Sequence, residues 1–194
     1  MTDRSPWLTF PALDLLGDLV KPTDRVFEYG GGGSTLYWMD HAAEVVTAEH
    51  HPEWFVALEK KMAAEREGAW TGHHIAAQSG TLVASPDPAD PAHYASSDPA
   101  YAGEHFRDYV QCIDRYADKS FDIVLVDGRA RTSCVRHAIP KLKQGGLLIL
   151  DNAEREHYTI RNADVLAKCT ILLSGMAPVI YDRDLSETRI YRKR

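Results

Sequence analysis

The sequence predicts a single α/β domain, residues 1–194, with a mostly parallel sheet covered by helices on both faces. Three observations lead to this class. Strand-like and helix-like segments alternate along the chain. The runs 121–127 and 146–150 are continuously apolar, as strands buried on both faces are. A glycine-rich turn at 30–33 joins the first strand to a helix. We see no internal repeat and no domain boundary.

The individual elements follow from hydrophobic periodicity and from turn residues. Apolar residues at helical spacing predict a first helix over 11–20, which Lys21 and Pro22 end. Pro52 is well placed in the first turn of another helix. The expected strands are 24–29, 45–49, 73–77, 121–127, 146–150, 170–173 and 188–191. The further expected helices are 34–41, 52–67, 105–116, 131–139 and 164–168.

One long segment, 85–103, fits no regular element. It is rich in proline and small residues and is too long to be a plain connection between a strand and a helix. Segments of this kind inside compact domains are often binding loops or lids. We therefore expect 85–103 to be a mobile lid over a ligand site.

Composition and charge exclude several classes of protein. The formal net charge of -6 argues against nucleic acid as a partner, and the basic residues of 189–194 are expected to be a solvated strand and tail. The chain lacks both an apolar run long enough for a membrane span and the apolar core of a secretion signal near Met1, so a cytoplasmic location is expected. Its three cysteines have no disulfide or metal-site spacing.

Polar residues gather where the predicted parallel strands end, which is where open α/β sheets bind ligands. Gly30 and Gly32 allow a tight turn and close approach of a ligand, and the following helix offers free N–H groups. A dinucleotide site needs a third glycine, but position 35 is Thr. Glu28, just before the turn, would repel a pyrophosphate but suits an amino group.

The segment 26–35 resembles motif I of class I S-adenosylmethionine (SAM)-dependent methyltransferases, an acid followed by Gly-x-Gly. Glu49 lies where that family places the acid that binds both ribose hydroxyls, and 121–127 and 141–150 resemble its fourth- and fifth-strand motifs. The resemblance implies an enzyme with a Rossmann-like, seven-stranded fold and SAM as cofactor. The cofactor contacts it implies are Glu28, Tyr29, Gly30, Gly32, Ser34, Thr35, Glu49, His50, Asp127 and Gly128.

A partial resemblance to metal-dependent O-methyltransferases of the catechol and caffeoyl-CoA type concerns Asp127, Asp151 and Asn152, which would bind one Mg²⁺ or Mn²⁺ ion. The expected lysine three residues after Asp127 is Ala130 here. Two neighbouring carboxylates need a cation, an arginine or a proton between them. We favour Arg129 or Arg131 folded inward, which would in turn favour a carboxylate- or phosphate-bearing substrate.

The resemblance implies methyl transfer to a small-molecule acceptor, with oxygen favoured over nitrogen as the acceptor atom. Asp127, Asp151 or His157 would remove the acceptor proton, and Arg129 would orient the substrate. Two alternatives stay open: an aminopropyl transferase of the spermidine-synthase type and a non-catalytic cofactor-binding module. A nucleic-acid methyltransferase is disfavoured because the chain lacks an Asn-Pro-Pro-Tyr or Asp-Pro-Pro-Tyr motif. The sequence leaves the oligomeric state open, a homodimer included.

Overall fold

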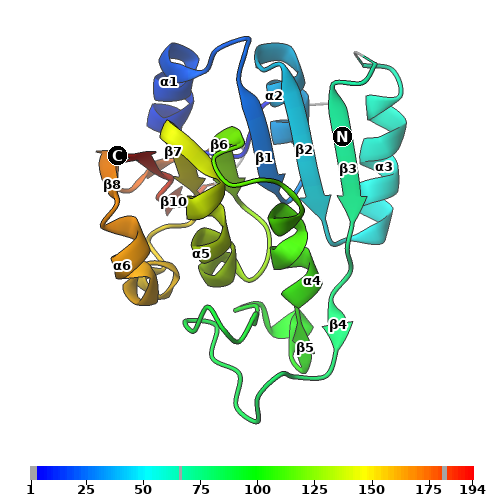
Figure 1. Cartoon of the computed structure of the whole chain (residues 1–194), viewed down its shortest axis with the longest axis vertical. Coiled ribbons are helices and arrows are strands. Elements are labelled where there is room, and N and C mark those ends of the chain that lie inside the picture. The colour runs from blue at the N-terminus through cyan, green and yellow to red at the C-terminus, as the bar shows by residue number, and fades with distance from the viewer. Residues whose placement is uncertain (1–3, 66, 181–182) are drawn as a thin grey trace.

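A seven-stranded sheet forms the centre of the molecule in the computed structural model, which describes residues 4–65, 67–180 and 183–194 (Figure 1). Met1 of the N-terminal stretch considered above lies outside these residues. The strands are β1 (Arg25–Tyr29), β2 (Glu44–Glu49), β3 (Trp70–His74), β6 (Phe121–Val126), β7 (Leu142–Leu150), β8 (Cys169–Leu173) and β11 (Arg189–Lys193). Their order is β3-β2-β1-β6-β7-β11-β8. The first five are parallel and β11 is antiparallel to both its neighbours, which confirms the predicted fold class.

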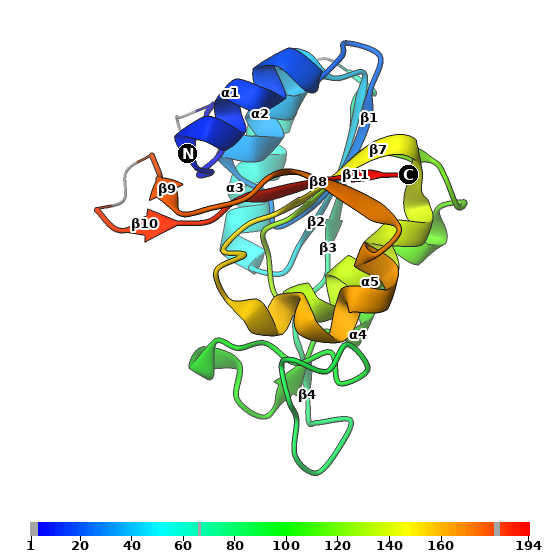
Figure 2. The same cartoon turned by 90° about the vertical axis from the view of Figure 1, so that its left-hand side faces the viewer.

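Helices cover both faces of the sheet, and Figure 2 shows the two layers on either side of the strands. One face carries α1 (Phe10–Leu19), α2 (Gly33–His41) and α3 (Pro52–Met62); the other carries α4 (Arg107–Val110), α5 (Arg131–Lys141) and α6 (Ala163–Leu166). Short 3-10 helices are η1 (Pro99–Tyr101), η2 (Gln111–Arg115), η3 (Glu156–Tyr158) and η4 (Ile160–Asn162). Two small antiparallel pairs are β4 (Gln78–Ser79) with β5 (Glu104–His105) and β9 (Ala177–Pro178) with β10 (Leu185–Ser186). No described helix is long and apolar enough to cross a membrane.

Strand β1 shows how the two cores are divided. Phe27 and Tyr29 belong to the core beneath α4 and α5, whereas Val26 belongs to the core beneath α1, α2 and α3. Successive side chains of a strand point to opposite faces, so Glu28 shares the face of Val26. An acid in this strand therefore points under α2 and α3 and not toward the open edge of the sheet.

Several element boundaries differ from expectation. The helix expected over 105–116 is wrong as one element, because His105 pairs with Gln78 in the small β4–β5 ladder and the chain then forms α4 and η2. Helix α3 ends at Met62, earlier than expected. Strand β7 begins at Leu142, before residue 146, because Leu142 already pairs with Phe121 of β6 ahead of a register shift.

The order of the strands creates a crevice between β1 and β6. From β1 the chain builds outward to β2 and β3, and it then returns to the other side of β1 to build β6 and β7. Ligands of open α/β sheets bind at such a reversal, outside the carboxyl ends of the strands. The segment 85–103 lies beyond these same ends, at the bottom of Figure 1, and η1 is its only regular element among the described residues.

Candidate active site

A cavity of about 780 Å³ occupies this crevice, outside the ends of β1, β2 and β6. Its volume lies in the ordinary range for small-molecule sites. Predicted cofactor residues that line it are Gly30, Gly32, Ser34, Glu49, His50, Asp127 and Gly128. Further lining residues are Trp7, Gly31, Gly33, His51, Trp54, Tyr101 and Arg129.

The glycine loop is tight at its first position. Gly30 has a φ of +88°, in the left-handed region that favours glycine, and a Cβ there would lie 3.1 Å from the Gly128 backbone. The loops that follow β1 and β6 therefore touch, and this contact forms the floor between them. Gly32 differs, because its backbone is extended and an added Cβ would meet only the Trp54 ring at an ordinary 3.6 Å.

Glu28 lies beneath the glycine loop and does not line the cavity, which corrects its expected role as a cofactor contact. Its side chain is fully buried and accepts hydrogen bonds from the hydroxyls of Ser34 (2.8 Å), Thr35 and Thr47 (2.8 Å). Burial raises its pKa to about 7, although the three hydroxyls act in the opposite direction. Glu28 therefore joins β1 and β2 to the first turn of α2 and holds the loop.

Two other expected cofactor contacts also lie in the interior. Tyr29 is fully buried, and its hydroxyl donates to the backbone carbonyl of Val110 at 2.6 Å. Thr35 is fully buried and accepts from the Gly32 N–H at 3.0 Å. Both residues shape the loop from within, and neither lines the cavity.

Glu49 lies at the end of β2 with its carboxylate in the cavity wall. One oxygen accepts from the N–H groups of His50 (2.8 Å) and His51 (2.7 Å), and the other accepts from the Gly31 N–H (2.9 Å). Burial alone would raise its pKa, but these bonds and the His50 ring lower it below its ordinary value. The carboxylate is thus fixed in place, ionised and bonded directly to the glycine loop.

Aromatic side chains that the sequence analysis did not assign complete this wall. Trp54 donates its indole N–H to the Gly31 carbonyl, and its ring lies against Gly32. Tyr101, from η1 in the 85–103 segment, shares a 3.0 Å hydrogen bond with the ring of His50. The sequence does hold a signal for Trp54. It lies in the first helical turn after Glu49, and that turn faces the same end of the sheet as the Glu49 carboxylate.

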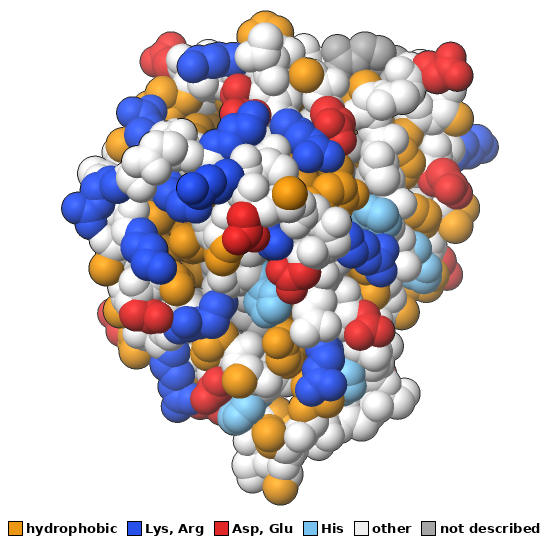
Figure 3. All heavy atoms as spheres, viewed as in Figure 1, with side chains coloured by type: hydrophobic (Ala, Val, Ile, Leu, Met, Phe, Trp, Pro, Cys, Tyr) orange, Lys and Arg blue, Asp and Glu red, His pale blue; other side chains and the backbone are white. Residues whose placement is uncertain are grey.

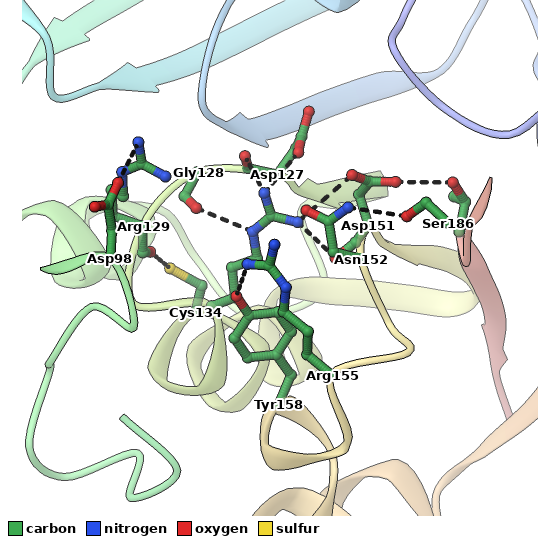
Figure 4. Close-up of polar contacts among 12 residues, drawn as sticks. Asp98, Asp127, Gly128, Arg129, Cys134, Asp151, Asn152, Arg155, Tyr158 and Ser186 are labelled. Carbon is green, nitrogen blue, oxygen red and sulfur yellow. Dashed lines mark hydrogen bonds and ion pairs between the residues drawn. The ribbon is translucent and has the colours of Figure 1, made fainter. Parts of the chain in front are cut away.

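An arginine joins the two acids that follow β6 and β7. The guanidinium of Arg131 contacts Asp127 at 2.9 Å and Asp151 at 3.6 Å, and it donates to the backbone carbonyls of Gly128, Asp127 and Asp151 (Figure 4). Burial raises the pKa of both carboxyls, the nearby Asp151 raises that of Asp127 further, and Arg131 opposes the shift in both. The structure therefore brings Asp127 and Asp151 together as expected, with an inward arginine between them.

These residues do not fit a divalent cation. The space between the two carboxylates is filled by the Arg131 guanidinium, whose charge would repel a metal ion. Asp151 also accepts from the Thr188 hydroxyl (2.8 Å), and Asn152 directs its amide to Ser186 at 2.9 Å. Among the described residues, no group of three acidic, histidine or cysteine side chains is placed to hold a metal. The expected Asp127–Asp151–Asn152 metal site is not supported.

A second, polar cavity of about 440 Å³ adjoins the first. Gly128 and Arg129 line both, so they form the boundary between the two. His157 and Asn152, expected near the reacting groups, line only the second cavity. Burial, together with nearby Arg155, lowers the pKa of His157, which favours its neutral form. The other walls of this second cavity come from 95–99 of the long loop and from Ala130, Arg131, Arg155 and Tyr158.

Basic side chains collect at the opposite edge of the sheet. Lys193 donates to the carbonyls of Ile139 and Leu142, where β7 begins, and Lys119 and Lys168 lie close enough to lower its pKa in addition to the effect of burial. Figure 3, which has the same view as Figure 1, shows Lys and Arg side chains spread over the upper left of the molecule. The basic surface is therefore at the far end of the sheet from both cavities.

No protein-family model and no curated protein sequence matches the chain. Solved structures do match it. An O-methyltransferase from Bacillus cereus in complex with SAH (S-adenosylhomocysteine) has a TM-score of 0.62 at 15% identity, covering 94% of this chain and 79% of that one. An rRNA methylase from Streptococcus thermophilus has 0.60 at 9%, covering 94% of each. The N-methyltransferase NodS from Bradyrhizobium japonicum has 0.57 at 9%, covering 94% and 92%. The chain therefore has the Rossmann-like fold found in these methyltransferases.

Proposed function

We propose that the protein is a SAM-dependent methyltransferase that acts on a small-molecule acceptor, with oxygen favoured over nitrogen as the acceptor atom. The observation that carries the proposal is the cavity at the β1–β6 crevice, where the glycine loop and the Glu49 carboxylate meet in one wall. The likeness in fold to solved O-, N- and rRNA methyltransferases supports the class of reaction without identifying the acceptor.

The residues of the larger cavity suit the parts of SAM. The ionised Glu49 would accept the two ribose hydroxyls, and the Trp54 ring offers an apolar surface for the adenine. Asp127, whose side chain is 28% exposed, would attract the positively charged amino group or sulfonium of the ligand. The glycine loop 30–33 lines the cavity, so its backbone is open to the ligand.

When bound, SAM supplies an electrophilic methyl group: the acceptor oxygen bonds to its carbon as the carbon–sulfur bond breaks and the electron pair stays on sulfur. The protein mainly holds the acceptor in line, which is an effect of proximity and orientation. A hydroxyl acceptor also loses a proton. Asp127 has a carboxyl whose pKa burial and Asp151 raise, so it is suited to take that proton near neutral pH.

The first test is the binding of SAM and SAH by isothermal titration calorimetry to wild type and to Glu49→Ala. The loss of charge-assisted hydroxyl contacts is about 1.5 to 3 kcal/mol. This corresponds to a roughly ten- to hundred-fold weaker affinity. Glu53→Ala is the matched control, because it removes an exposed carboxylate from the start of α3 that does not line the cavity.

Four results would contradict the proposal. Wild-type protein that binds neither SAM nor SAH excludes the SAM site. A folded Glu49→Ala variant with unchanged affinity excludes the assignment of Glu49. Transfer from decarboxylated SAM in place of methyl transfer from SAM, across a panel of acceptors, would establish an aminopropyl transferase, and no transfer from either donor would leave a non-catalytic binding module.

A further inference from the structure

The polar cavity has an excess of positive charge in its walls. Its charged lining residues are the guanidiniums of Arg129, Arg131 and Arg155 and a single carboxylate, that of Asp98. Asp127 and Asp151 balance the charge of Arg131, so the positive groups that bear on a ligand in this cavity are Arg129 and Arg155. A concave site with a charge of one sign favours small ligands of the other sign.

The three arginines differ in how completely they are neutralised. Arg131 lies between Asp127 and Asp151, and Arg129 forms a 3.1 Å ion pair with Asp98. Arg155 forms the longest of these ion pairs, with its Nε 3.8 Å from a carboxylate oxygen of Glu154. That Glu154 carboxylate already accepts from the backbone N–H of residue 187 (3.0 Å).

The guanidinium of Arg155 is held in place while keeping hydrogen-bond donors for a ligand. One nitrogen donates to the Tyr158 hydroxyl at 3.2 Å, and the side chain is half exposed. Figure 4 shows Arg155 with Tyr158 at the lower centre, and Arg129 with Asp98 at the upper left of the same group of residues. A guanidinium has five N–H donors in a planar fork that fits carboxylate and phosphate oxygens in pairs. Most of the donors of Arg155 remain for a ligand.

We propose that the polar cavity is the acceptor subsite and that it binds the oxyanion group of a small anionic substrate through Arg155, with Arg129 at its inner boundary. The inference rests on the proposed methyltransferase function. Because Gly128 and Arg129 line both cavities, a substrate anchored at Arg155 has its other end directed toward the cavity assigned to SAM. The substrate class is therefore an acceptor that carries a carboxylate or a phosphate at one end and its nucleophile at the other.

The test uses two small anions and one neutral analogue on the full-length protein. Binding of 4-hydroxybenzoate, inorganic phosphate and 4-hydroxybenzamide is measured by calorimetry, with and without saturating SAH. The benzoate and the benzamide share their shape and differ in charge. We expect one or both anions to bind and the benzamide to bind at least roughly ten-fold more weakly, as loss of a charge-assisted pair implies. Whichever anion binds more tightly shows whether the group recognised is a carboxylate or a phosphate.

Variants locate the binding. Arg155→Gln should weaken the anion roughly ten- to hundred-fold. Lys168→Gln, which removes a charge at the opposite edge of the sheet, should not change it. Tyr158→Phe removes the hydroxyl that Arg155 holds, so it reports the effect of loosening the loop alone. Thermal unfolding of each variant confirms that it is folded.

The proposal is overturned if the benzamide binds as tightly as the tighter-binding anion, if neither anion binds, or if a folded Arg155→Gln variant keeps the wild-type affinity. It is also overturned if Tyr158→Phe reproduces the whole loss, since Arg155 would then act only as a tether for the loop. SAH binding is measured on the same samples. Failure of SAH to bind refutes the proposed function, whereas SAH binding without anion binding refutes the acceptor subsite alone.

Discussion

The buried acid beneath the glycine loop gives a sharp test of the site. Glu28 is fully buried, and its pKa of about 7 lies above the ordinary value of 4.5. The difference between these two pKa values corresponds to about 3 kcal/mol of free energy favouring the protonated form in the folded state. Because the folded state holds this proton more tightly than the unfolded chain, the folded state carries more protons between these two pH values. The free energy of unfolding should therefore fall as the pH rises from 4.5 to about 7.

Two substitutions separate the charge of Glu28 from its hydrogen bonds. Glu28→Gln keeps an oxygen that can accept from Thr35 and Thr47, and its amide can donate to Ser34 Oγ. Glu28→Ala leaves all three hydroxyls without an acceptor. We expect Glu28→Ala to lower the free energy of unfolding by about 3 kcal/mol or more at every pH, because each buried unsatisfied group costs about 1 to 3 kcal/mol.

The assay is urea unfolding followed by tryptophan fluorescence from about pH 5 to about pH 8, the window set by the raised pKa. The stability of Glu28→Gln relative to wild type should increase by about 2 to 3 kcal/mol across that window, because only wild type carries the buried charge at the upper end. Parallel profiles for the two proteins would refute the reasoning. Equal losses in Glu28→Gln and Glu28→Ala would show that the carboxylate, and not its hydrogen-bond geometry, holds the loop.

Three further predictions concern the loops around the cavities. Arg131→Met should destabilise the fold by about 3 to 5 kcal/mol, as removal of one member of a buried ion pair does. If Arg131 takes the place of a metal, wild-type activity should also survive exhaustive EDTA treatment; activity that is lost and restored only by Mg²⁺ or Mn²⁺ would establish a metal. Gly30→Ala should lower the melting temperature and SAH affinity together, whereas Gly32→Ala should leave the melting temperature unchanged; equal shifts would contradict the different φ angles. Proteolysis within 85–103 should slow when SAH and an anionic acceptor are both present, and an unchanged rate would exclude a lid.

The sequence predicts the fold well because its signals there are local. The apolar runs that become β6 and β7 and the glycine turn after β1 each specify their own element, and alternation along the chain then requires a parallel sheet. Boundaries are less certain where pairing is not local. The chain around His105 reads as a helix, but its backbone pairs with Gln78, and no pattern near either residue announces that ladder.

The sequence predicts where the candidate site lies, but not the direction in which each of its side chains points. Gly30, Glu49 and Asp127 line the cavity at the β1–β6 crevice, as their positions at strand ends predict. Glu28, Tyr29 and Thr35 come from the same stretch of sequence but lie buried beneath the loop. The role of Glu28 could have been corrected from the sequence, because it alternates with Phe27 and shares the side of Val26, which faces α2 and α3. No local pattern could have placed Tyr101 against His50, since α3, β3 and most of the long proline-rich loop lie between them in sequence and only the tertiary structure brings them together.

The choice between a metal and an arginine shows how one backbone feature decides the chemistry. Ala130 takes a φ of +48°, which turns the chain sharply before α5 and places Arg131 in the first turn of the helix. From there its guanidinium folds back onto the carbonyls of Asp127, Gly128 and Asp151, which end β6 and β7. One positive charge against two carboxylates leaves a net charge of -1 at this centre. A divalent cation would neutralise both acids and leave neither able to accept a proton, whereas the arginine leaves one, and Asp127 is the acid that reaches the cavity.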